Sequence, residues 1–110
     1  MIALEQLEEM FAGMRAQTPW NVDGPLLWGY FFTCSRKETL KSVAQHLSDL
    51  GYRFVEAHQT EDGAVWVLHM EQGEMHTPQT LFERNRQLEE LASSYGLDSY
   101  DGMDVGPLPS

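Results

Sequence analysis

The sequence predicts an α+β sandwich, and three observations lead to this prediction. Helix-like and strand-like segments follow one another in the order helix, strand, helix, strand, strand, helix, and the C-terminal segment is a candidate short fourth strand. The first and third strand-like segments are apolar on both faces, as central strands are, whereas the second is more polar, as an edge strand is. With 110 residues, the chain can bury one core. We therefore predict a single domain, 1–110, with the βαββα order of a ferredoxin-like sandwich preceded by one extra N-terminal helix.

The extra helix is predicted over residues 1–18. Leu4, Leu7 and Phe11 recur at spacings of three and four, while glutamates occupy other parts of the helical surface. Pro19 ends this pattern. Residues 19–25 are predicted to form a turn-rich connection, so the helix has one apolar face to bury before the sandwich begins.

The sandwich is predicted over residues 26–105, and a short tail, 106–110, follows it. Residues 26–33, LLWGYFFT, read as the first strand because aromatic and apolar residues fall on both of its faces. The Ser-x-x-Glu pattern from Ser35 to Glu38 predicts a capping box at the start of the next helix. Gly51 is expected to end that helix in a left-handed conformation.

Two more strands are predicted over residues 52–59 and 64–71. Asp62-Gly63 between them is a common hairpin turn. The two helices that accompany the strands cover only one face of such a sheet. Because the central strands are apolar on the other face too, we expect the N-terminal helix or a partner chain to cover it.

The last helix is predicted to begin at Thr77, since a threonine cap followed by Pro78 is a strong helix start. Gly96 is expected to end it. Asn85 interrupts the apolar stripe of this helix, and we expect a hydrogen-bonded core asparagine in preference to a binding contact.

The charge of the chain is strongly negative. There are 17 acidic and 7 basic residues, which gives a formal net charge of −10. Such a field repels phosphate backbones and anionic membrane surfaces and attracts cationic surfaces. We therefore expect a protein partner with a basic surface, no direct nucleic-acid binding and no membrane binding. No segment has the pattern of a signal peptide, so a cytoplasmic location is expected.

The side chains that could act in catalysis do not form a recognisable catalytic set. Cys34 is the single cysteine, which excludes a disulfide within the chain and a multi-cysteine zinc site. No nucleophile–base pair and no glycine-rich phosphate loop is visible. We therefore predict that the protein is not an enzyme.

Residues 69–76, HMEQGEMH, form the one metal-like cluster of the sequence. Nitrogen and oxygen donors of this kind suit zinc or iron, and the candidate ligands are His69, Glu71, Glu74 and His76. Their spacing matches no tight ligand motif, and the segment is also where a strand must give way to a helix. We favour ordinary structural roles and expect no cofactor, with the metal site as an alternative.

Residues 88–105, LEELASSYGLDSYDGMDV, resemble the C-terminal signature of the family called regulator of ribonuclease E activity B. In that signature a helix ending in Leu-Ala is followed by an aromatic residue, a short turn and Tyr-Asp-Gly-aromatic. Tyr100, Asp101 and Gly102 map to it, whereas Met103 stands where the family usually has tryptophan. The segment GYRF, 51–54, and the order of elements over nearly the whole chain also agree. The long acidic tail often found after the signature is replaced here by VGPLPS.

The resemblance implies a ferredoxin-like α+β sandwich and a non-catalytic protein. Members of the family are similar to acidic inhibitors that bind the non-catalytic, RNA-binding part of ribonuclease E and so alter RNA turnover. Ribonuclease E is thus the partner that the resemblance implies.

We predict an interaction module that presents carboxylates to a basic protein surface. The candidate protein-binding residues are Glu83, Glu89, Glu90, Asp98, Tyr100, Asp101, Gly102, Met103 and Asp104. Two alternatives stay open: a domain that binds a small molecule or metal, and a homodimeric scaffold whose sheet faces pair. The protein is accordingly expected to be a monomer or a homodimer.

Overall fold

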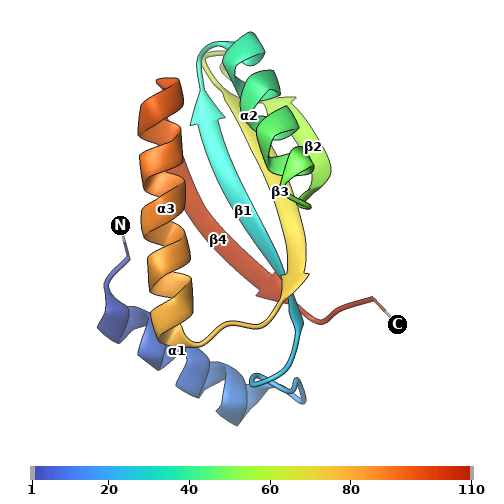
Figure 1. Ribbon diagram of the computed structural model, residues 1–110, viewed down its shortest axis with the longest axis vertical. Coiled ribbons are helices and arrows are strands. Elements are labelled where there is room, and N and C mark those ends of the chain that lie inside the picture. Colours follow the sequence, from blue (N-terminus) through green and yellow to red (C-terminus); the bar gives the residue numbers. More distant parts are fainter. Residues whose placement is uncertain (1, 110) are drawn as a thin grey trace.

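The computed structural model describes residues 2–109 and contains three helices and a four-stranded antiparallel sheet (Figure 1). The elements are α1 (Leu4–Gln17), β1 (Leu26–Cys34), α2 (Lys37–Asp49), β2 (Arg53–Gln59), β3 (Trp66–Glu74), α3 (Pro78–Tyr95) and β4 (Ser99–Gly106). The predicted α+β class is confirmed. Residue 1 of the predicted 1–18 helix and residue 110 of the predicted tail lie outside the described residues. No helix within 2–109 combines the length and the apolar character needed to cross a membrane.

The strand order of the sheet is β2-β3-β1-β4, and every neighbouring pair is antiparallel. β1 and β3 therefore lie in the centre and β2 lies at an edge, as the distribution of polar residues predicts. The C-terminal segment forms the other edge. β4 has eight residues, so it is a full strand and not the short one expected from the sequence.

The core lies between one face of the sheet and the helices α2 and α3 (Figure 1). The centre of the core is formed by alternate residues of β1. Trp28, Tyr30 and Phe32 are all buried, and they point to the same side of the strand. Leu81 and Leu88 of α3 complete the packing from the helical side. This burial of aromatic and branched side chains is the main favourable contribution to folding.

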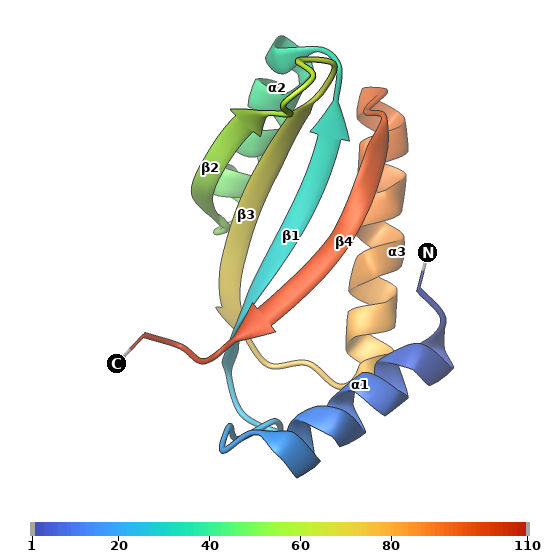
Figure 2. The same cartoon turned by 180° about the vertical axis from the view of Figure 1, so that it is seen from behind.

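α1 runs across the lower end of the sheet and leaves the second face open (Figure 2). Leu7, Phe11 and Met14 form its buried stripe. The ring of Phe11 stacks on Trp28 with centroids 5.8 Å apart. The expectation that the N-terminal helix covers the second sheet face is therefore wrong, because its apolar side chains are used at the end of the core.

The helix boundaries follow the predicted signals at both ends of α3 but only at the C-terminal end of α2, where Gly51 has a φ of 101°. The Thr77 hydroxyl accepts a hydrogen bond of 3.1 Å from the backbone of Thr80, and Gly96 ends the helix with a φ of 72°. The capping box predicted at Ser35 is absent, because the N-cap of α2 is Arg36, which makes no side-chain cap. β1 continues to Cys34 and α2 begins at Lys37, so Ser35 lies in the bend between the two elements, one residue before the N-cap.

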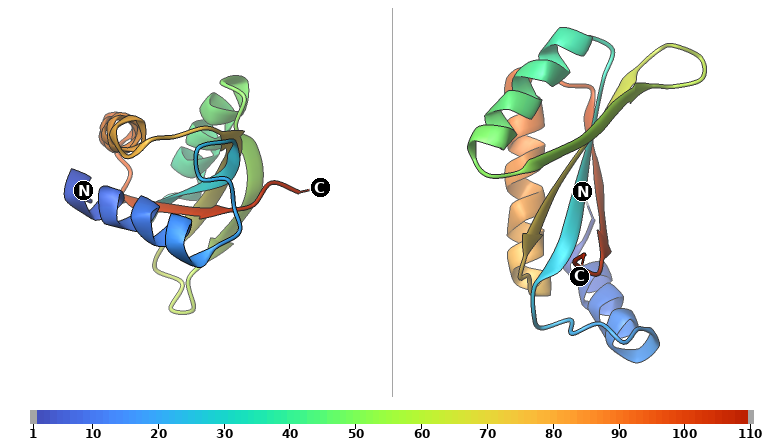
Figure 3. Two further views of the ribbon diagram at one scale, coloured as in Figure 1. Left: turned by 90° about the horizontal axis from the view of Figure 1, so that it is seen from below. Right: turned by 90° about the vertical axis from the view of Figure 1, so that its right-hand side faces the viewer.

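The β2–β3 hairpin turns at the predicted place. The Asp62 carboxylate accepts a hydrogen bond of 3.0 Å from the backbone of Ala64, and Gly63 has a φ of 73°. β3 continues to Glu74 and is longer than the predicted run of 64–71. The hairpin extends beyond the helical layer (Figure 3).

Candidate functional site

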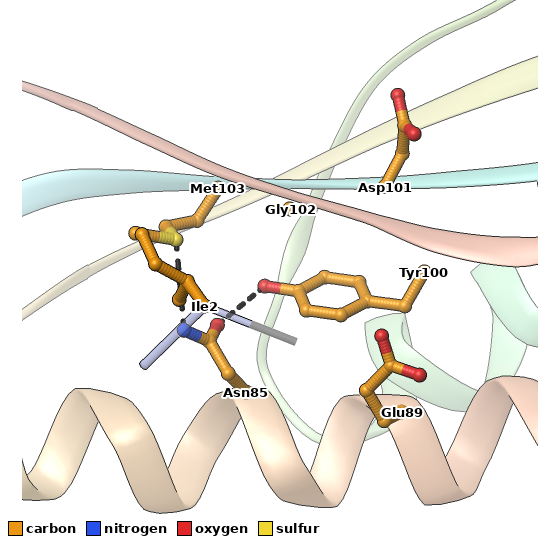
Figure 4. Close-up of a pocket in the computed structure, with 7 residues that line it drawn as sticks. All are labelled: Ile2, Asn85, Glu89, Tyr100, Asp101, Gly102 and Met103. Atoms are coloured by element: carbon orange, nitrogen blue, oxygen red, sulfur yellow. Dashed lines mark hydrogen bonds between the residues drawn. The ribbon is translucent and has the colours of Figure 1, made fainter. Parts of the chain in front are cut away.

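α3 and β4 lie side by side and enclose a groove of about 350 Å³ at one edge of the sheet (Figure 1). We call this the α3–β4 groove. Figure 4 shows its lining residues, which are Asn85 and Glu89 from α3 and Tyr100, Asp101, Gly102 and Met103 from β4. Ile2, from the segment before α1, closes one end. The groove thus joins three parts of the chain that are far apart in sequence.

The spacing of residues explains why these side chains meet. Asn85 and Glu89 are four residues apart, so they lie on the same side of α3. Tyr100 and Met103 are three residues apart on a strand, a spacing that would normally put them on opposite faces. Both nevertheless face α3, because the pairing with β1 shifts by one residue between them.

The shift is a β-bulge formed by the Asp-Gly step of the C-terminal signature. Tyr100 pairs with Phe32 and Gly102 pairs with Phe31, so Asp101 is the extra residue. Gly102 adopts a φ of 106°, which side chains strongly disfavour. The Tyr-Asp-Gly sequence is therefore a structural device that turns Met103 back toward the helix.

A hydrogen bond in the groove connects the signature to α3. The Tyr100 hydroxyl donates to the side-chain oxygen of Asn85 at 2.6 Å, and the Asn85 amide nitrogen lies 3.6 Å from the sulfur of Met103. Burial, followed by the neighbouring Tyr52 and Glu89, raises the pKa of Tyr100, so its hydroxyl stays protonated and can donate. The predicted role of Asn85 as a hydrogen-bonded core residue is confirmed, since only 1% of it is exposed.

The carboxylates of the groove lie at its rim. In Figure 4 the side chain of Glu89 projects from α3 toward Tyr100, while Asp101 points away from the helix. Asp101 is exposed and Glu89 is half-buried. A partner seated on the groove would therefore meet the Glu89 carboxylate on the helical side and the Asp101 carboxylate on the outer side of β4.

Of the nine residues predicted for protein binding, five line the α3–β4 groove: Glu89, Tyr100, Asp101, Gly102 and Met103. The other four lie outside it. Glu83 and Glu90 both pair with Arg86 on the exposed side of α3, which lowers the pKa of Glu83. Asp98 precedes β4, and its backbone donates to the Thr33 carbonyl at 3.0 Å.

Asp104 lies on the open face of the sheet. Its carboxylate oxygen and His69 Nε2 both lie over Gly29, in the space that a Cβ at this position would need. The glycine on β1 therefore allows side chains from β4 and β3 to approach each other above it. His69 also stacks on Phe31, with ring centroids 4.3 Å apart.

The four candidate metal ligands are not brought together. His69 and Glu71 lie on the open face of the sheet, where Glu71 pairs with Arg53. Glu74 and His76 lie on the helical side with Tyr30. No group of three or more acidic, histidine or cysteine side chains suited to a metal ion occurs within residues 2–109.

Glu74 instead lies at the centre of a polar network on the helical side of the sheet. Its Oε1 atom accepts hydrogen bonds of 2.6 Å from Tyr30 and from Arg84 and lies 2.9 Å from His76 Nε2. Burial raises the pKa of Glu74, but the hydrogen bonds from His76 and Tyr30 and the charge of Arg84 outweigh this, so the pKa is lowered overall. Arg84 also donates to the Tyr52 hydroxyl at 2.7 Å. The network holds a partly buried carboxylate and supplies its hydrogen-bond partners.

Sequence reasoning missed two features of the site. It did not place Ile2 at the α3–β4 groove, because nothing in the first residues indicates where the chain before a helix will run. It also did not identify the β-bulge at Asp101. The signal for the bulge was present as an Asp-Gly step inside a strand pattern, where an isolated glycine often marks a bulge.

The comparisons with known proteins support one family. No curated protein matches the chain. The family model described as "Regulator of ribonuclease activity B" (RraB) matches residues 4–105, from the first residue of α1 to the second-last residue of β4. Because the match covers nearly the whole chain, the protein belongs to the RraB family of regulators of ribonuclease activity.

Proposed function

We propose that the protein regulates a ribonuclease by binding it through the α3–β4 groove. The family supplies the general role, because its members are described as regulators of ribonuclease activity. The single observation that carries the site is the convergence of five predicted binding residues in one groove of about 350 Å³. We infer that the groove receives a side chain of the partner while Glu89 and Asp101 contact cationic groups around it.

The partner in this proposal is a protein with a basic surface, and ribonuclease E is the enzyme that the sequence resemblance implies. A net charge of −10 accelerates encounter with a cationic surface and opposes direct contact with RNA. We propose that the protein acts in the cytoplasm without catalysis, by occupying the surface that its partner uses to bind RNA. In this proposal the hydrogen bond between Tyr100 and Asn85 has a structural role, which is to fix β4 against α3.

The proposed fold type supports this role. Read from β4, the strand order is β4-β1-β3-β2, with α2 and α3 on one face, and we interpret it as a ferredoxin-like sandwich with α1 added at one end. The binding residues then belong to a helix and an edge strand of a rigid scaffold. A preformed surface of this kind loses little conformational entropy on binding.

The test is a charge reversal within the groove. Glu89→Lys/Asp101→Lys should weaken binding to the purified non-catalytic region of ribonuclease E by about tenfold or more, measured by titration calorimetry at low salt. The matched control is Glu56→Lys/Glu61→Lys, which changes the net charge equally at two exposed positions away from the groove, one on the opposite edge strand β2 and one in the β2–β3 turn. The control should change Kd by no more than about twofold.

Two results would overturn the proposal. One is an absence of binding between the wild-type protein and that region at low ionic strength, where steering is strongest. The other is an equal loss of affinity in both double variants, which would show that net charge alone matters and that the α3–β4 groove is not the contact.

A further inference from the structure

Free positive charge in this acidic chain is concentrated at one corner of the molecule. Four of the five arginines pair with carboxylates: Arg15 with Asp23, Arg53 with Glu71, Arg84 with Glu74, and Arg86 with Glu83 and Glu90. The remaining basic residues are Arg36 and the two lysines of the chain, Lys37 and Lys41. All three lie at the beginning of α2, and none of them forms an ion pair with a carboxylate within the described residues 2–109.

Helix stability does not account for this placement. The first turn of a helix carries a partial positive charge, which favours acidic residues and opposes basic ones. Arg36 and Lys37 are therefore placed where they are electrostatically unfavourable for α2 itself. For Arg36 this cost is offset by a hydrogen bond of 3.3 Å to the Gly96 carbonyl at the C-terminal end of α3, where a cation is favourable. Within residues 2–109 no carboxylate pairs with Lys37 to offset its charge in the same way.

The two lysines flank an apolar groove between α2 and β2, which we call the α2–β2 groove. Its volume is about 200 Å³. The apolar lining residues are Leu40, Ala44, Phe54, Ala57, Trp66 and Leu68. Lys37 lies over the ring of Trp66 with its ammonium nitrogen 4.7 Å from the centroid, so its charge is held beside the groove.

The groove exists because α2 does not cover β2. Every residue of β2 is exposed, which is unusual for a strand beside a helix. The pairing with β3 shifts between Phe54 and Glu56, and this bulge puts Phe54 and Ala57 on the same face although they are three residues apart. Phe54 is consequently 51% exposed at the wall of the groove.

The backbone of β2 adds a second binding element. β2 is an edge strand that pairs only with β3 among the described residues, so one side of it presents unpaired N–H and C=O groups. An extended segment of another protein can pair with such an edge and place alternate side chains into adjacent pockets.

We propose that the α2–β2 groove binds an extended, acidic segment of a partner protein that inserts one large apolar side chain between α2 and β2. The apolar lining selects the inserted side chain, and Lys37 and Lys41 select acidic residues on either side of it. A volume of about 200 Å³ suits one side chain better than a typical small-molecule ligand. A second copy of the chain is disfavoured because a two-fold contact here would bring the same lysines toward each other.

This proposal is independent of the α3–β4 groove, which lies at the opposite edge of the sheet and has the opposite charge. The protein would then connect a basic partner at one edge with an acidic segment at the other. An experiment that refutes binding at one of the two grooves therefore leaves the proposal for the other groove unaffected.

The probe for the test is a display library of random nine-residue peptides selected against the intact protein. We expect the enriched peptides to contain one large apolar residue with aspartate or glutamate nearby. Their affinity should fall by about tenfold in Lys37→Glu/Lys41→Glu. The matched control Arg15→Glu/Arg86→Glu makes the same change in net charge away from the groove and should preserve binding.

A second pair of variants tests the groove itself. Ala57→Trp fills it from an exposed position on β2, so folding should be preserved, and peptide binding should be lost. His58→Trp adds the same ring to the other face of β2 and should leave binding unchanged. Circular dichroism on all variants confirms that they are folded.

The proposal is overturned if selection yields no binders or yields basic sequences. It is also overturned if acidic binders keep their affinity in both Lys37→Glu/Lys41→Glu and Ala57→Trp. A concentration-dependent dimer in sedimentation experiments that Ala57→Trp dissociates would likewise overturn it, because the occupant would then be a second copy of the chain.

Discussion

Tyr100 of β4 and Asn85 of α3 form a buried hydrogen bond of 2.6 Å that links the C-terminal edge strand to the last helix. The tyrosine belongs to the signature by which the sequence resembles the ribonuclease regulators. Its hydroxyl faces the core side of the α3–β4 groove, while Asp101 faces away. Within one signature, Tyr100 therefore closes the fold and Asp101 is available for a partner.

Tyr100→Phe should lower the free energy of unfolding by about 1–3 kcal/mol, because the side-chain oxygen of Asn85 loses its donor in a buried site. Urea denaturation followed by circular dichroism measures this change. Tyr95→Phe is the matched control, since Tyr95 is half-buried in α3 and its hydroxyl forms no hydrogen bond to another described side chain.

The double variant Tyr100→Phe/Asn85→Leu separates the lost hydrogen bond from lost packing. Replacing both partners with apolar groups removes the unsatisfied atom, so the double variant should be more stable than Tyr100→Phe alone. If the double variant is instead the less stable of the two, then packing, and not polar satisfaction, dominates at this contact.

Gly102→Ala should destabilise the protein by about 1–3 kcal/mol, because a φ of 106° is strained for any residue with a Cβ. Gly106→Ala is the control on the same strand. No atom lies within 4 Å of the added Cβ at either position, and only Gly102 has a positive φ. Equal effects of the two substitutions in thermal unfolding would contradict the structural role assigned to the bulge.

Phe11→Ala should cost about 3–5 kcal/mol, because it removes a buried ring that stacks on Trp28 and anchors α1. The emission of Trp28 should shift to longer wavelength as water reaches the indole. Glu9→Ala, on the exposed side of the same helix, should change stability by less than about 0.5 kcal/mol. An unchanged emission maximum in Phe11→Ala would show that α1 does not protect Trp28.

Glu74 should make stability depend on pH in the acidic range. Its pKa in the folded protein is lowered from an ordinary value of 4.5 although burial opposes this, because His76, Tyr30 and Arg84 favour the charged form. The stabilisation is therefore present in full above pH 4.5 and is lost as the pH falls through the folded-state pKa. Denaturation curves between neutral and strongly acidic pH should show this loss in the wild type.

Glu74→Gln should be less stable than the wild type at neutral pH, and the difference should shrink below pH 4.5. Glu83→Gln serves as the comparison, since Glu83 is exposed and pairs only with surface groups. A constant difference between wild type and Glu74→Gln across the whole range would rule out the carboxylate as the titrating group.

Most of the fold could be predicted from the sequence because local signals and burial agree. Thr77 and Gly96 mark the ends of α3 through chemistry that acts within a few residues. The apolar character of β1 on both faces placed it correctly in the centre of the sheet. The cap predicted at Ser35 was wrong by one residue, because α2 begins at Lys37 with Arg36 as its N-cap, and a local motif does not fix where the preceding strand releases the chain.

The site was predictable only in part, and for the same reason. The acidic residues near the C-terminus are visible in the sequence, but which of them share a groove depends on the register between β1 and β4. Asp104 and Asp101 are three residues apart, yet Asp104 lies above Gly29 on the open face, while Asp101 borders the α3–β4 groove. The α2–β2 groove was not anticipated, because nothing local indicates that α2 leaves β2 exposed.

The separation of charge between the two edges affects how the molecule meets other proteins. Lys37 and Lys41 at the α2–β2 groove and the carboxylates of Glu89 and Asp101 at the α3–β4 groove lie at opposite edges of the sheet, so the two grooves are lined by opposite charges. A cationic surface should therefore attract the β4 edge more strongly than the α2–β2 groove. The α2–β2 groove then stays exposed to solvent. A second partner can bind there while the first is in place, so the two partners need not compete.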